Sequence, residues 1–317
     1  MKHCKTFHAL AAAAIMTTAV ACEYKDLGTD PVFDNGTEVV VRFDWDRTDS
    51  IPQSMRMAFY NKNFNVHYIY DVNSHEDTIM VPKGDYEVAA WNGDTKHVYV
   101  GGLGKRTALY ATTPHFNPRF SASVTMLMDS LFSRQAMLDY PDYMVHDNHE
   151  LESIEKYEKK IITMHPDSMV YSVRVRMGGI AGLDICRSIR GAIGNMAGTR
   201  FIGFQEKTQD YVTIVFDANG NAQDSTVTAD FYVFGLEPTE RTEPADSTLM
   251  AVFFWTDSGN TYLRLNVTEY INKAKRDGSR TFIIDLGDMN IDLRSLLQKS
   301  MIDISVEEWN DEHHGLS

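Results

Sequence analysis

The chain has 317 residues, and at about 150 residues per domain this length predicts two domains, each with a sizeable hydrophobic core. The formal net charge is −14 at pH 7, with 44 Asp and Glu against 30 Lys and Arg. This excess of negative charge argues against nucleic acid or anionic lipid headgroups as partners.

The first 21 residues have the layout of a secretory signal. Lys2 and Lys5 give a positive start, and residues 9–16 form an apolar segment that is too short to span a bilayer. Removing residues 1–21 would leave 296 residues with a net charge of −16, because both lysines leave with the signal. No later segment reaches about 18 consecutive apolar residues, so the sequence predicts no membrane-spanning helix.

The sequence Ala19-Val20-Ala21-Cys22 ends this signal and resembles the lipobox of bacterial lipoproteins. Ala19 stands where leucine is commoner, and the small residues Ala19 and Ala21 also fit an ordinary signal-peptidase site. We expect cleavage after Ala21 and a lipid on Cys22, because the cysteine follows the small residues directly. Several acyl chains would hold the protein on a membrane, since each buried methylene contributes about 0.8 kcal/mol. The alternative is an ordinary secreted protein.

Residues 22–36 are polar and interrupted by proline and glycine, which is typical of an extended tether. Cys4 would leave with the signal and Cys22 would carry lipid, so Cys186 has no partner for a disulfide. No local pattern marks Cys186 as a reactive thiol, and we expect it to be a small buried hydrophobic residue.

Residues 37–157 are predicted to form an N-terminal β-sandwich domain. Apolar residues of the segment Val39–Trp45 alternate with Arg42 and Asp44, as in a strand with one face in a core. Turns rich in Asn, Asp, Gly and Pro separate further strand patterns, at 55–60, 66–70, 78–81, 86–91 and 97–100. Many short strands with no long helical pattern between them favour a β-sandwich over a parallel βαβ sheet.

The pattern is looser between residues 103 and 160. Residues 124–138 contain a segment that fits a helix, and the charged residues 150–160 fit either a helix or a surface strand. The boundary between the two domains is placed near residue 157, before strand patterns resume.

Residues 158–310 are predicted to form a second β-sandwich, followed by a tail at 311–317. A strand is expected over 169–177, where valines alternate with arginines. A short helix is expected over 183–196, where apolar residues keep helical spacing despite two glycines. Asn219-Gly220 is expected to form the turn of a hairpin. Further strands are expected at 211–216, 226–234, 249–256, 261–267, 280–286 and 302–309, so the predicted fold class is mainly β with two tandem β-sandwich domains.

His146, His149 and Glu150 form the one compact cluster of metal-ligand residue types that the sequence suggests. Residues three apart on a helix share a face and could share an ion, but no third ligand follows at a useful spacing. The alternative interpretation is a solvated loop. The acidic run over 44–49 lacks the spacing of an EF-hand calcium loop.

The sequence contains no nucleophile elbow, no Gly-rich phosphate loop and no HExxH motif, so we expect neither an enzyme nor a bound cofactor. Trp45, Trp91, Trp255 and Trp309 all fall in strand-like patterns. We expect them in hydrophobic cores and not on the surface as platforms for sugars.

A segment from Thr78 to Asn92, TIMVPKGDYEVAAWN, resembles one in the fimbrillin-related lipoproteins of the Bacteroidetes, which include minor fimbrial subunits and anchors. In that family a strand, a Pro-x-Gly-x-Tyr turn and a second strand ending in aromatic-Asn recur. Val39–Trp45, Arg190–Gly198 and Val306–Trp309 resemble the family's opening strand, a small-residue turn and the closing strand, in the same order.

The resemblance implies two transthyretin-like, Greek-key β-sandwich domains and attachment to the outer membrane through lipid on Cys22, facing the cell exterior. It also implies a non-catalytic fimbrial anchor, minor subunit or adhesin, whose partners are fimbrial subunits joined by β-strand addition. The alternative is a surface lipoprotein that binds glycans for polysaccharide uptake.

Short motifs of Asp followed by Ser or Thr, and then by an apolar residue or Thr, resemble the O-glycosylation acceptor of exported proteins in this phylum. They place candidate acceptors at Ser50, Thr78, Ser130, Ser168, Ser225 and Ser247, of which Thr78 is expected to start a strand.

Overall fold

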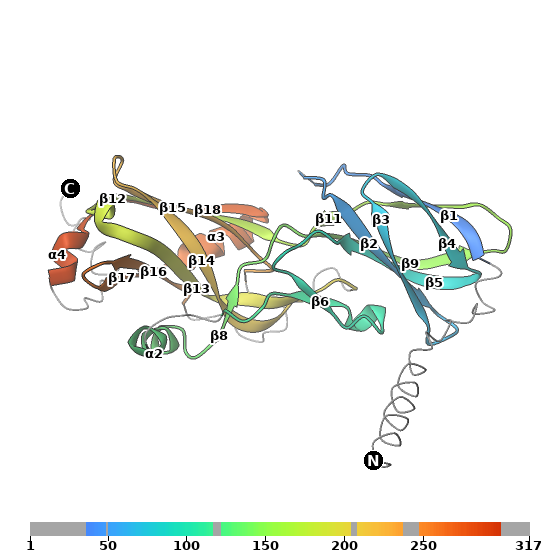
Figure 1. Ribbon diagram of the computed structural model, residues 1–317, viewed down its shortest axis with the longest axis horizontal. Coiled ribbons are helices and arrows are strands. Elements are labelled where there is room, and N and C mark those ends of the chain that lie inside the picture. Colours follow the sequence, from blue (N-terminus) through green and yellow to red (C-terminus); the bar gives the residue numbers. More distant parts are fainter. Residues whose placement is uncertain (1–35, 49, 117–121, 204–207, 237–246, 299–317) are drawn as a thin grey trace, which may run out of the picture.

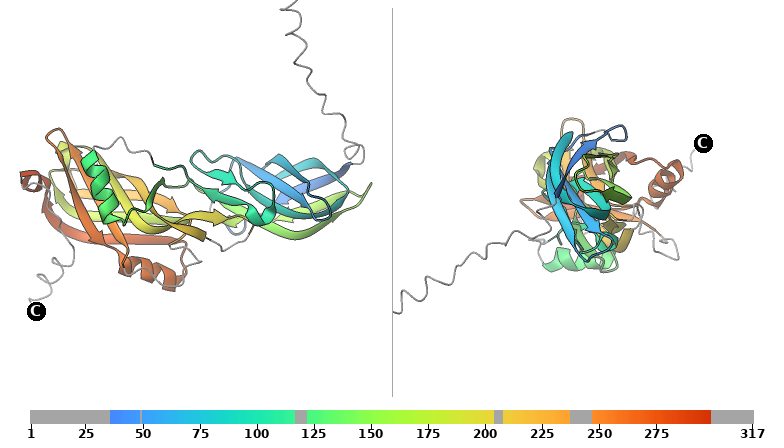
Figure 2. Two further views of the ribbon diagram at one scale, coloured as in Figure 1. Left: turned by 90° about the horizontal axis from the view of Figure 1, so that it is seen from below. Right: turned by 90° about the vertical axis from the view of Figure 1, so that its right-hand side faces the viewer.

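The computed structural model describes residues 36–48, 50–116, 122–203, 208–236 and 247–298 (Figure 1). Strands dominate these residues, which confirms the predicted mainly β fold. The molecule is elongated, with N-terminal strands at one end and C-terminal strands at the other (Figures 1 and 2). No helix in these ranges is long and apolar enough to cross a membrane.

Two sheets pack face to face at the N-terminal end, in the strand orders β10-β1-β4 and β11-β9-β5-β2-β3. Their strands are β1 (Gly36–Phe43), β2 (Ser54–Asn61), β3 (His67–Asn73), β4 (Glu76–Pro82), β5 (Gly84–Asn92), β9 (Val145–Ile154), β10 (Lys160–Met164) and β11 (Asp167–Ser168). Val39 and Val41 of one sheet meet Met57 and Phe59 of the other in a single hydrophobic core. This packing of two inner faces defines a β-sandwich.

A ten-stranded sheet forms the C-terminal end, with the main order β17-β16-β13-β14-β15-β12-β18 and with β6, β7 and β8 beside it. Its strands are β6 (Tyr99–Gly101), β7 (Tyr110–Thr112), β8 (Ala136–Asp139), β12 (Tyr171–Ala181), β13 (Cys186–Phe201), β14 (Thr208–Asn221), β15 (Thr226–Val233), β16 (Leu249–Thr256), β17 (Asn260–Asn266) and β18 (Thr281–Asp292). Strand β14 pairs with β13 over most of its length and with β15 only at its end. The sheet therefore turns at β14, and both of its parts contribute to one core, in which the rings of Phe216 and Phe231 stack with centroids 4.0 Å apart.

Helices are short in the described residues: η2 (Arg106–Ala108), α2 (Ala122–Leu131), η3 (Leu183–Ile185), α3 (Thr268–Asp277) and α4 (Leu293–Gln298). Helix α2 overlaps the helix predicted over 124–138 and packs Met128 on the sheet beside Phe253. Helix α3 was not predicted. Its buried residues Ile271 and Ala274 face the core, and Gly278 ends it with a φ of 62°.

Residue 157 does not separate the strands of the N-terminal sandwich from those of the ten-stranded sheet. Strands β7 and β8 precede this residue and pair with β13 and β14, whereas β10 and β11 follow it and pair with β1 and β9. The chain thus passes between the two ends of the molecule more than once. The division into domains at 37–157 and 158–310 stays a prediction.

The helix predicted over 183–196 is wrong. Only the single turn η3 forms there, and β13 then runs between β14 and β16. Gly191 explains the result, because a Cβ atom at this position would overlap the ring of Phe216 on β14. Ile189 and Met196 are both buried because a central strand covered on both faces needs no alternation, so their helical spacing had no structural meaning.

The predicted hairpin of β14 and β15 exists, but its turn lies further along the chain. Asn219 and Gly220 are inside the ladder, and the chain reverses only after Asn221. Ser225 supplies the positive φ of that turn, at 52°. The turn propensity of Asn-Gly thus predicted the hairpin correctly, but not the position of its turn or the register of its strands.

Other strand predictions can be compared residue by residue. Val173 and Val175 of β12 are buried while Arg174 and Arg176 are exposed, as their alternation predicted. The charged segment predicted over 150–160 as a helix or a strand begins inside strand β9. The strand predicted over 302–309 lies outside the described residues.

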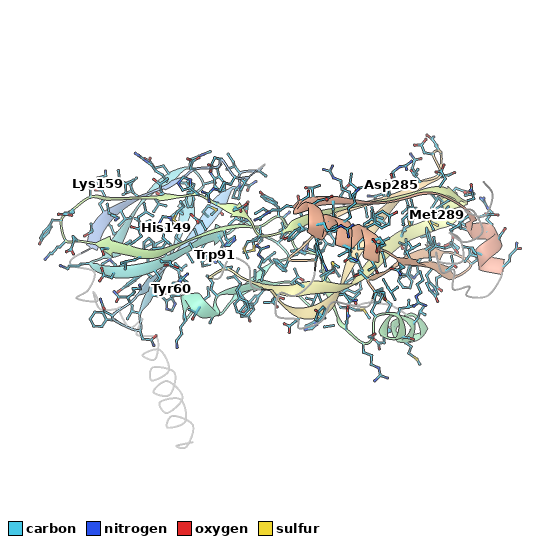
Figure 3. The ribbon with its side chains drawn as sticks, turned by 180° about the vertical axis from the view of Figure 1, so that it is seen from behind. Tyr60, Trp91, His149, Lys159, Asp285 and Met289 are labelled. Carbon is cyan, nitrogen blue, oxygen red and sulfur yellow. The ribbon has the colours of Figure 1, made fainter. Side chains whose placement is uncertain are left out.

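A third hydrophobic cluster joins the two ends of the molecule. Tyr60 and Trp91, on β2 and β5, pack with Leu109, Ile202 and Phe234, which lie beside strands of the ten-stranded sheet. Figure 3 shows Trp91 near this junction. Because the contact is buried and apolar, we expect the two ends to move as one body.

Candidate functional site

The three predicted metal ligands lie on strand β9 and not on a helix. His146 is buried, His149 is half-buried and Glu150 is exposed. Residues three apart on a strand point to opposite faces, so the two imidazoles are separated, and the three side chains do not form a group that could hold one ion. The spacing argument assumed a helix, and the fold removes that assumption.

His149, labelled in Figure 3, instead belongs to a group of charged residues on β9 and β10. Its Nδ1 lies 2.7 Å from Glu152 Oε1 and its Nε2 lies 3.6 Å from Asp147 Oδ2, while Lys160 Nζ lies 3.0 Å from the other Glu152 oxygen. Asp147 and then Glu152 raise the pKa of His149 above its ordinary value, against the opposing effect of burial. The protonated form of His149 is therefore favoured by the two carboxylates beside it.

His146 has the opposite environment. Only 3 % of this residue is exposed, and burial, followed by the positive charge of Arg200, lowers the pKa of His146 to about 4. It is a neutral core histidine at physiological pH. Its side chain packs where β9 meets the ten-stranded sheet, since its neighbour Asn148 donates a hydrogen bond to the carbonyl of Ile202 at 2.5 Å.

The hairpin of β4 and β5 carries the segment that resembles fimbrillin-related lipoproteins. The Tyr86 hydroxyl is buried and donates to the Pro82 carbonyl at 2.9 Å, which closes the turn between the strands. The end of β5 is fixed by Asn92, whose side chain accepts the N–H of Val145 at 2.9 Å and donates to the carbonyl of Tyr143 at 3.2 Å. These residues shape the fold and form no reactive site.

Two neighbouring strands at one side of the N-terminal sandwich have edges that pair with no other strand in the described part of the chain. Strands β3 and β4 are the last strands of their sheets on this side, and the Tyr70 hydroxyl links them by donating to the Met80 carbonyl at 2.7 Å. Apolar side chains are exposed beside these edges, including Ile69 and Met80. An unpaired edge offers backbone N–H and C=O groups to another strand.

A groove of about 600 Å³ opens where β6 and β7 meet β8, β13 and β14. Its walls carry two tyrosines, Tyr99 and Tyr211, together with the polar residues Thr113, Thr199 and Asp210. Tyr99 is exposed over 63 % of its surface. Aromatic faces beside hydroxyl and carboxylate groups are the residue types that bind sugars or peptides. The sequence had drawn attention to tryptophans and gave no sign of these tyrosines.

The tryptophans differ in burial. Trp91 is 2 % exposed, which confirms that it is a core residue, whereas Trp45 and Trp255 are half-buried against core clusters. Trp309 lies outside the described residues. Cys186 is a free, half-buried thiol whose pKa burial raises, so it is not activated as a nucleophile.

Several predicted modification sites can be placed on the fold. Ala21 and the lipid acceptor Cys22 lie outside the described residues. Among the candidate glycosylation sites, Ser50, Thr78 and Ser130 are exposed, and Ser168, Ser225 and Ser247 are half-buried. Thr78 lies within strand β4.

A curated relative supports the resemblance found in the sequence. The chain is 25 % identical over 285 residues to Fim4B of Bacteroides ovatus, a candidate fimbrium anchoring subunit, and the match covers 86 % of this chain and 81 % of the relative. This finding confirms the resemblance to fimbrial proteins of the Bacteroidetes.

Solved structures share the fold. The crystal structure of a candidate adhesin from Bacteroides ovatus superimposes with a TM-score of 0.61 at 22 % identity, over 77 % of this chain and 87 % of that one. The crystal structure of candidate polysaccharide-binding proteins from Bacteroides thetaiotaomicron superimposes with a TM-score of 0.50 at 11 % identity, over 79 % of this chain and 90 % of that one. At these identities the likeness shows the fold alone.

One protein-family profile covers residues 21–217, which is more than half of the chain. Its match includes the N-terminal sandwich and continues into the ten-stranded sheet as far as β14. The chain therefore belongs to the family described as "Domain of unknown function (DUF5119)".

Proposed function

We propose that this chain is a non-catalytic cell-surface protein of a fimbrial or adhesive system, acting as an anchor or minor subunit. The observation that carries the proposal is the similarity to a candidate fimbrium anchoring subunit along 86 % of the chain. A half-buried Cys186 whose pKa burial raises and a histidine pair that the fold separates are consistent with a role in contact and not in chemistry.

Lipid on Cys22 would attach the chain to the outer membrane by its N-terminal end. Strand β1 begins at Gly36, at the end of the molecule far from the ten-stranded sheet (Figure 1). Residues 22–35 span at most about 50 Å when fully extended. The N-terminal sandwich would then lie close to the membrane, and the ten-stranded sheet would point away from it.

Fimbrial partners would join by adding a strand at the unpaired edges of β3 and β4. The backbone groups of an open edge supply hydrogen bonds, and the exposed Ile69 and Met80 supply side-chain contacts for a partner strand. Charged residues at an edge oppose such pairing. Ile69→Lys and Met80→Lys should therefore weaken assembly while leaving the buried core intact.

The test is expression of the wild-type chain and of Cys22→Ser in a Bacteroides host from which the gene is deleted. We expect a lipid-bearing N-terminal cysteine by mass spectrometry, an outer-membrane location, and fimbriae that are shed into the medium when Cys22 is replaced. An unmodified thiol at the mature N-terminus would contradict the lipid anchor. Unchanged fimbriae after gene deletion would contradict the fimbrial role.

The edge variants are tested in the same host. Ile283→Lys is the matched control, because Ile283 is an exposed residue on β18, a terminal strand of the ten-stranded sheet at the other end of the molecule. Loss of fimbrial attachment with Ile69→Lys and not with Ile283→Lys supports addition at the β3–β4 edges. The reverse result would place the contact on the ten-stranded sheet and contradict this part of the proposal.

A second candidate function, glycan binding, is favoured by the groove that Tyr99 and Tyr211 line. In this case Tyr99→Ala should abolish binding on a glycan array, and deletion of the gene should leave fimbriae unaffected. Array binding that is absent from the wild-type chain would remove this alternative.

A further inference from the structure

Two parallel strands of the N-terminal sandwich deliver an aspartate and a histidine to the same place. In the β1–β10 ladder Phe43 is level with Met164, and Asp44 N–H continues the ladder by donating to the Met164 carbonyl at 2.8 Å. Asp44 and His165 are the residues that directly follow these two strands, so they lie side by side at the edge of the sheet. This placement follows from backbone register and does not depend on the rotamers of the two side chains.

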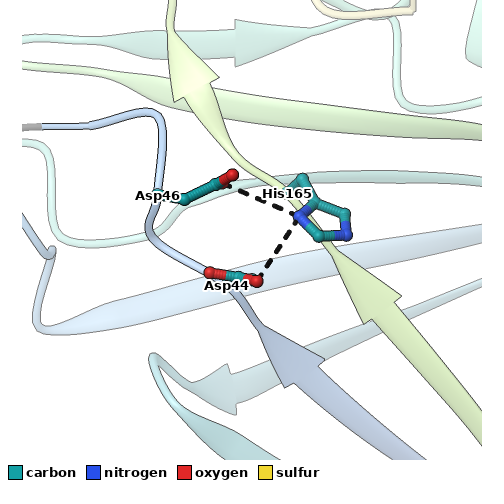
Figure 4. A group of neighbouring side chains, drawn as sticks. All are labelled: Asp44, Asp46 and His165. Carbon is teal, nitrogen blue, oxygen red and sulfur yellow. Dashed lines mark ion pairs between the residues drawn. The ribbon is translucent and has the colours of Figure 1, made fainter.

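Asp46 completes the group from the turn after β1 (Figure 4). That turn is tied down by Trp45, whose indole N–H donates to the Ser74 carbonyl at 2.7 Å. One ligand atom from each of Asp44, Asp46 and His165 lies within 4.8 Å of the other two. Among the described residues this is the group of carboxylates and imidazoles that has the geometry to share an ion.

The distances fit an ion between the three side chains better than direct hydrogen bonds. His165 Nδ1 lies 3.8 Å from Asp44 Oδ2 and 3.7 Å from Asp46 Oδ1, beyond the usual hydrogen-bond range. This Nδ1 is itself buried and has no hydrogen-bond partner among the residues that the structure describes, although the ring as a whole is partly exposed. A metal about 2.1 Å from each ligand atom would occupy the space between them and satisfy Nδ1.

The histidine backbone is held in position by a neighbouring carboxylate. His165 N–H donates to Asp147 Oδ2 at 2.7 Å, and Asp147 is in turn held by His149. The ligands are therefore fixed by a ladder, by an indole and by a buried aspartate. Such supporting contacts set the orientation of metal ligands.

We propose that Asp44, Asp46 and His165 bind a divalent transition-metal ion such as Zn²⁺. One imidazole and two carboxylates, with water as a fourth ligand, match the preferences of Zn²⁺, whereas Ca²⁺ requires six to eight oxygen ligands. The function of the site is structural: it fastens the turn after β1 to the end of β10.

The position of the site links it to the junction between the two ends of the molecule. Asp167 lies two residues after His165 and forms an ion pair with Arg280, which directly precedes β18. A guanidinium nitrogen of Arg280 lies 2.8 Å from the Asp167 carboxylate. Metal bound at His165 would therefore also stiffen the segment that carries this ion pair. Zn²⁺ should raise the temperature of unfolding, because a ligand that binds only the folded state stabilises it.

The test is titration of the full mature chain, without a polyhistidine tag, with ZnCl₂ by isothermal calorimetry and by thermal unfolding. We expect binding and a rise in unfolding temperature for the wild type, and at least about tenfold weaker binding for Asp46→Asn and for His165→Ala. CaCl₂ should give neither effect. The histidines His313 and His314 remain in every variant, so the difference between variants isolates the proposed site.

His97→Ala is the matched control, because His97 forms an exposed pair with Asp142, with Nδ1 3.4 Å from a single carboxylate. This variant should bind Zn²⁺ as the wild type does. Circular dichroism checks that Asp46→Asn, a change on an exposed turn, leaves the fold intact. Equal Zn²⁺ binding by wild type, Asp46→Asn and His165→Ala, or no binding by the wild type, would overturn the proposal.

Discussion

Contacts of individual side chains explain why the turn between β4 and β5 contains glycine and tyrosine in the Pro-x-Gly-x-Tyr pattern. Tyr86 packs edge-to-face on Phe59, with ring centroids 5.9 Å apart, while its hydroxyl closes the turn at Pro82. A Cβ atom on Gly84 would press against the side chain of Asn61 and the Tyr86 ring. The tyrosine thus needs the glycine beside it, and the two residues are constrained together.

Tyr86→Phe tests the contribution of the buried hydroxyl alone. The ring keeps its packing, so the loss is that of the hydroxyl's hydrogen bonding, chiefly to the Pro82 carbonyl, about 1 kcal/mol of the free energy of unfolding. Urea denaturation of the two proteins measures it. An unchanged midpoint would show that water replaces the hydroxyl, and that the turn does not depend on this bond.

The pKa values of the two histidines of β9 are shifted in opposite directions from their ordinary value. The raised pKa of His149 gives stability that is complete below the unfolded value of 6.5 and is lost as pH rises through the folded pKa. The lowered pKa of His146 gives stability that is complete above 6.5 and is lost as pH falls towards about 4, at a cost of roughly 3 kcal/mol. NMR titration of the imidazole resonances distinguishes the two groups.

His149→Gln separates these effects, because it removes one titrating group and keeps a neutral side chain of similar size. The fall in urea midpoint above pH 6.5 should become shallower in this variant, while the fall on the acidic side remains. If the urea midpoint of His149→Gln depends on pH as that of the wild type does, the Asp147–His149–Glu152 group contributes nothing to stability.

At the scale of elements, sequence patterns predicted β1, the pair of β16 and β17 and the two faces of β12, since alternation and turn residues are local properties. They failed at β13, where burial on both faces removes alternation. They also failed for Asp44, Asp46 and His165, because a parallel ladder joins residues about 120 positions apart. Local spacing instead pointed to His146 and His149, which the strand separates.

Gly191→Val tests whether β13 is selected by close packing. The new side chain would meet the Phe216 ring, which is stacked on Phe231, and overpacking of this kind costs about 1–3 kcal/mol. Gly104→Val is the control, because a Cβ there meets nothing within 4 Å. Chemical denaturation should show a large loss for the first variant and little change for the second. Equal losses would contradict the packing argument.

At the scale of the whole molecule, any force between the two ends is transmitted through the junction formed by the third hydrophobic cluster and its neighbours. If the chain is tethered through its N-terminal end, as proposed, tension applied at the ten-stranded sheet would pass through the cluster around Trp91 and through the Asp167–Arg280 pair. The ion pair is partly exposed on both sides and contributes little by itself. The apolar cluster is therefore the part of the junction on which coupling depends.

Trp91→Ala should uncouple the two ends. Truncating a buried tryptophan costs about 3–5 kcal/mol, and here the cavity opens between the ends and not inside either core. Calorimetry should show one cooperative transition for the wild type and two for the variant, since each end keeps its own hydrophobic cluster. Trp45→Ala is the control, because in the described part of the chain Trp45 packs on the N-terminal core, and its loss should lower stability without dividing the transition. A single transition in Trp91→Ala would show that the ends are coupled elsewhere.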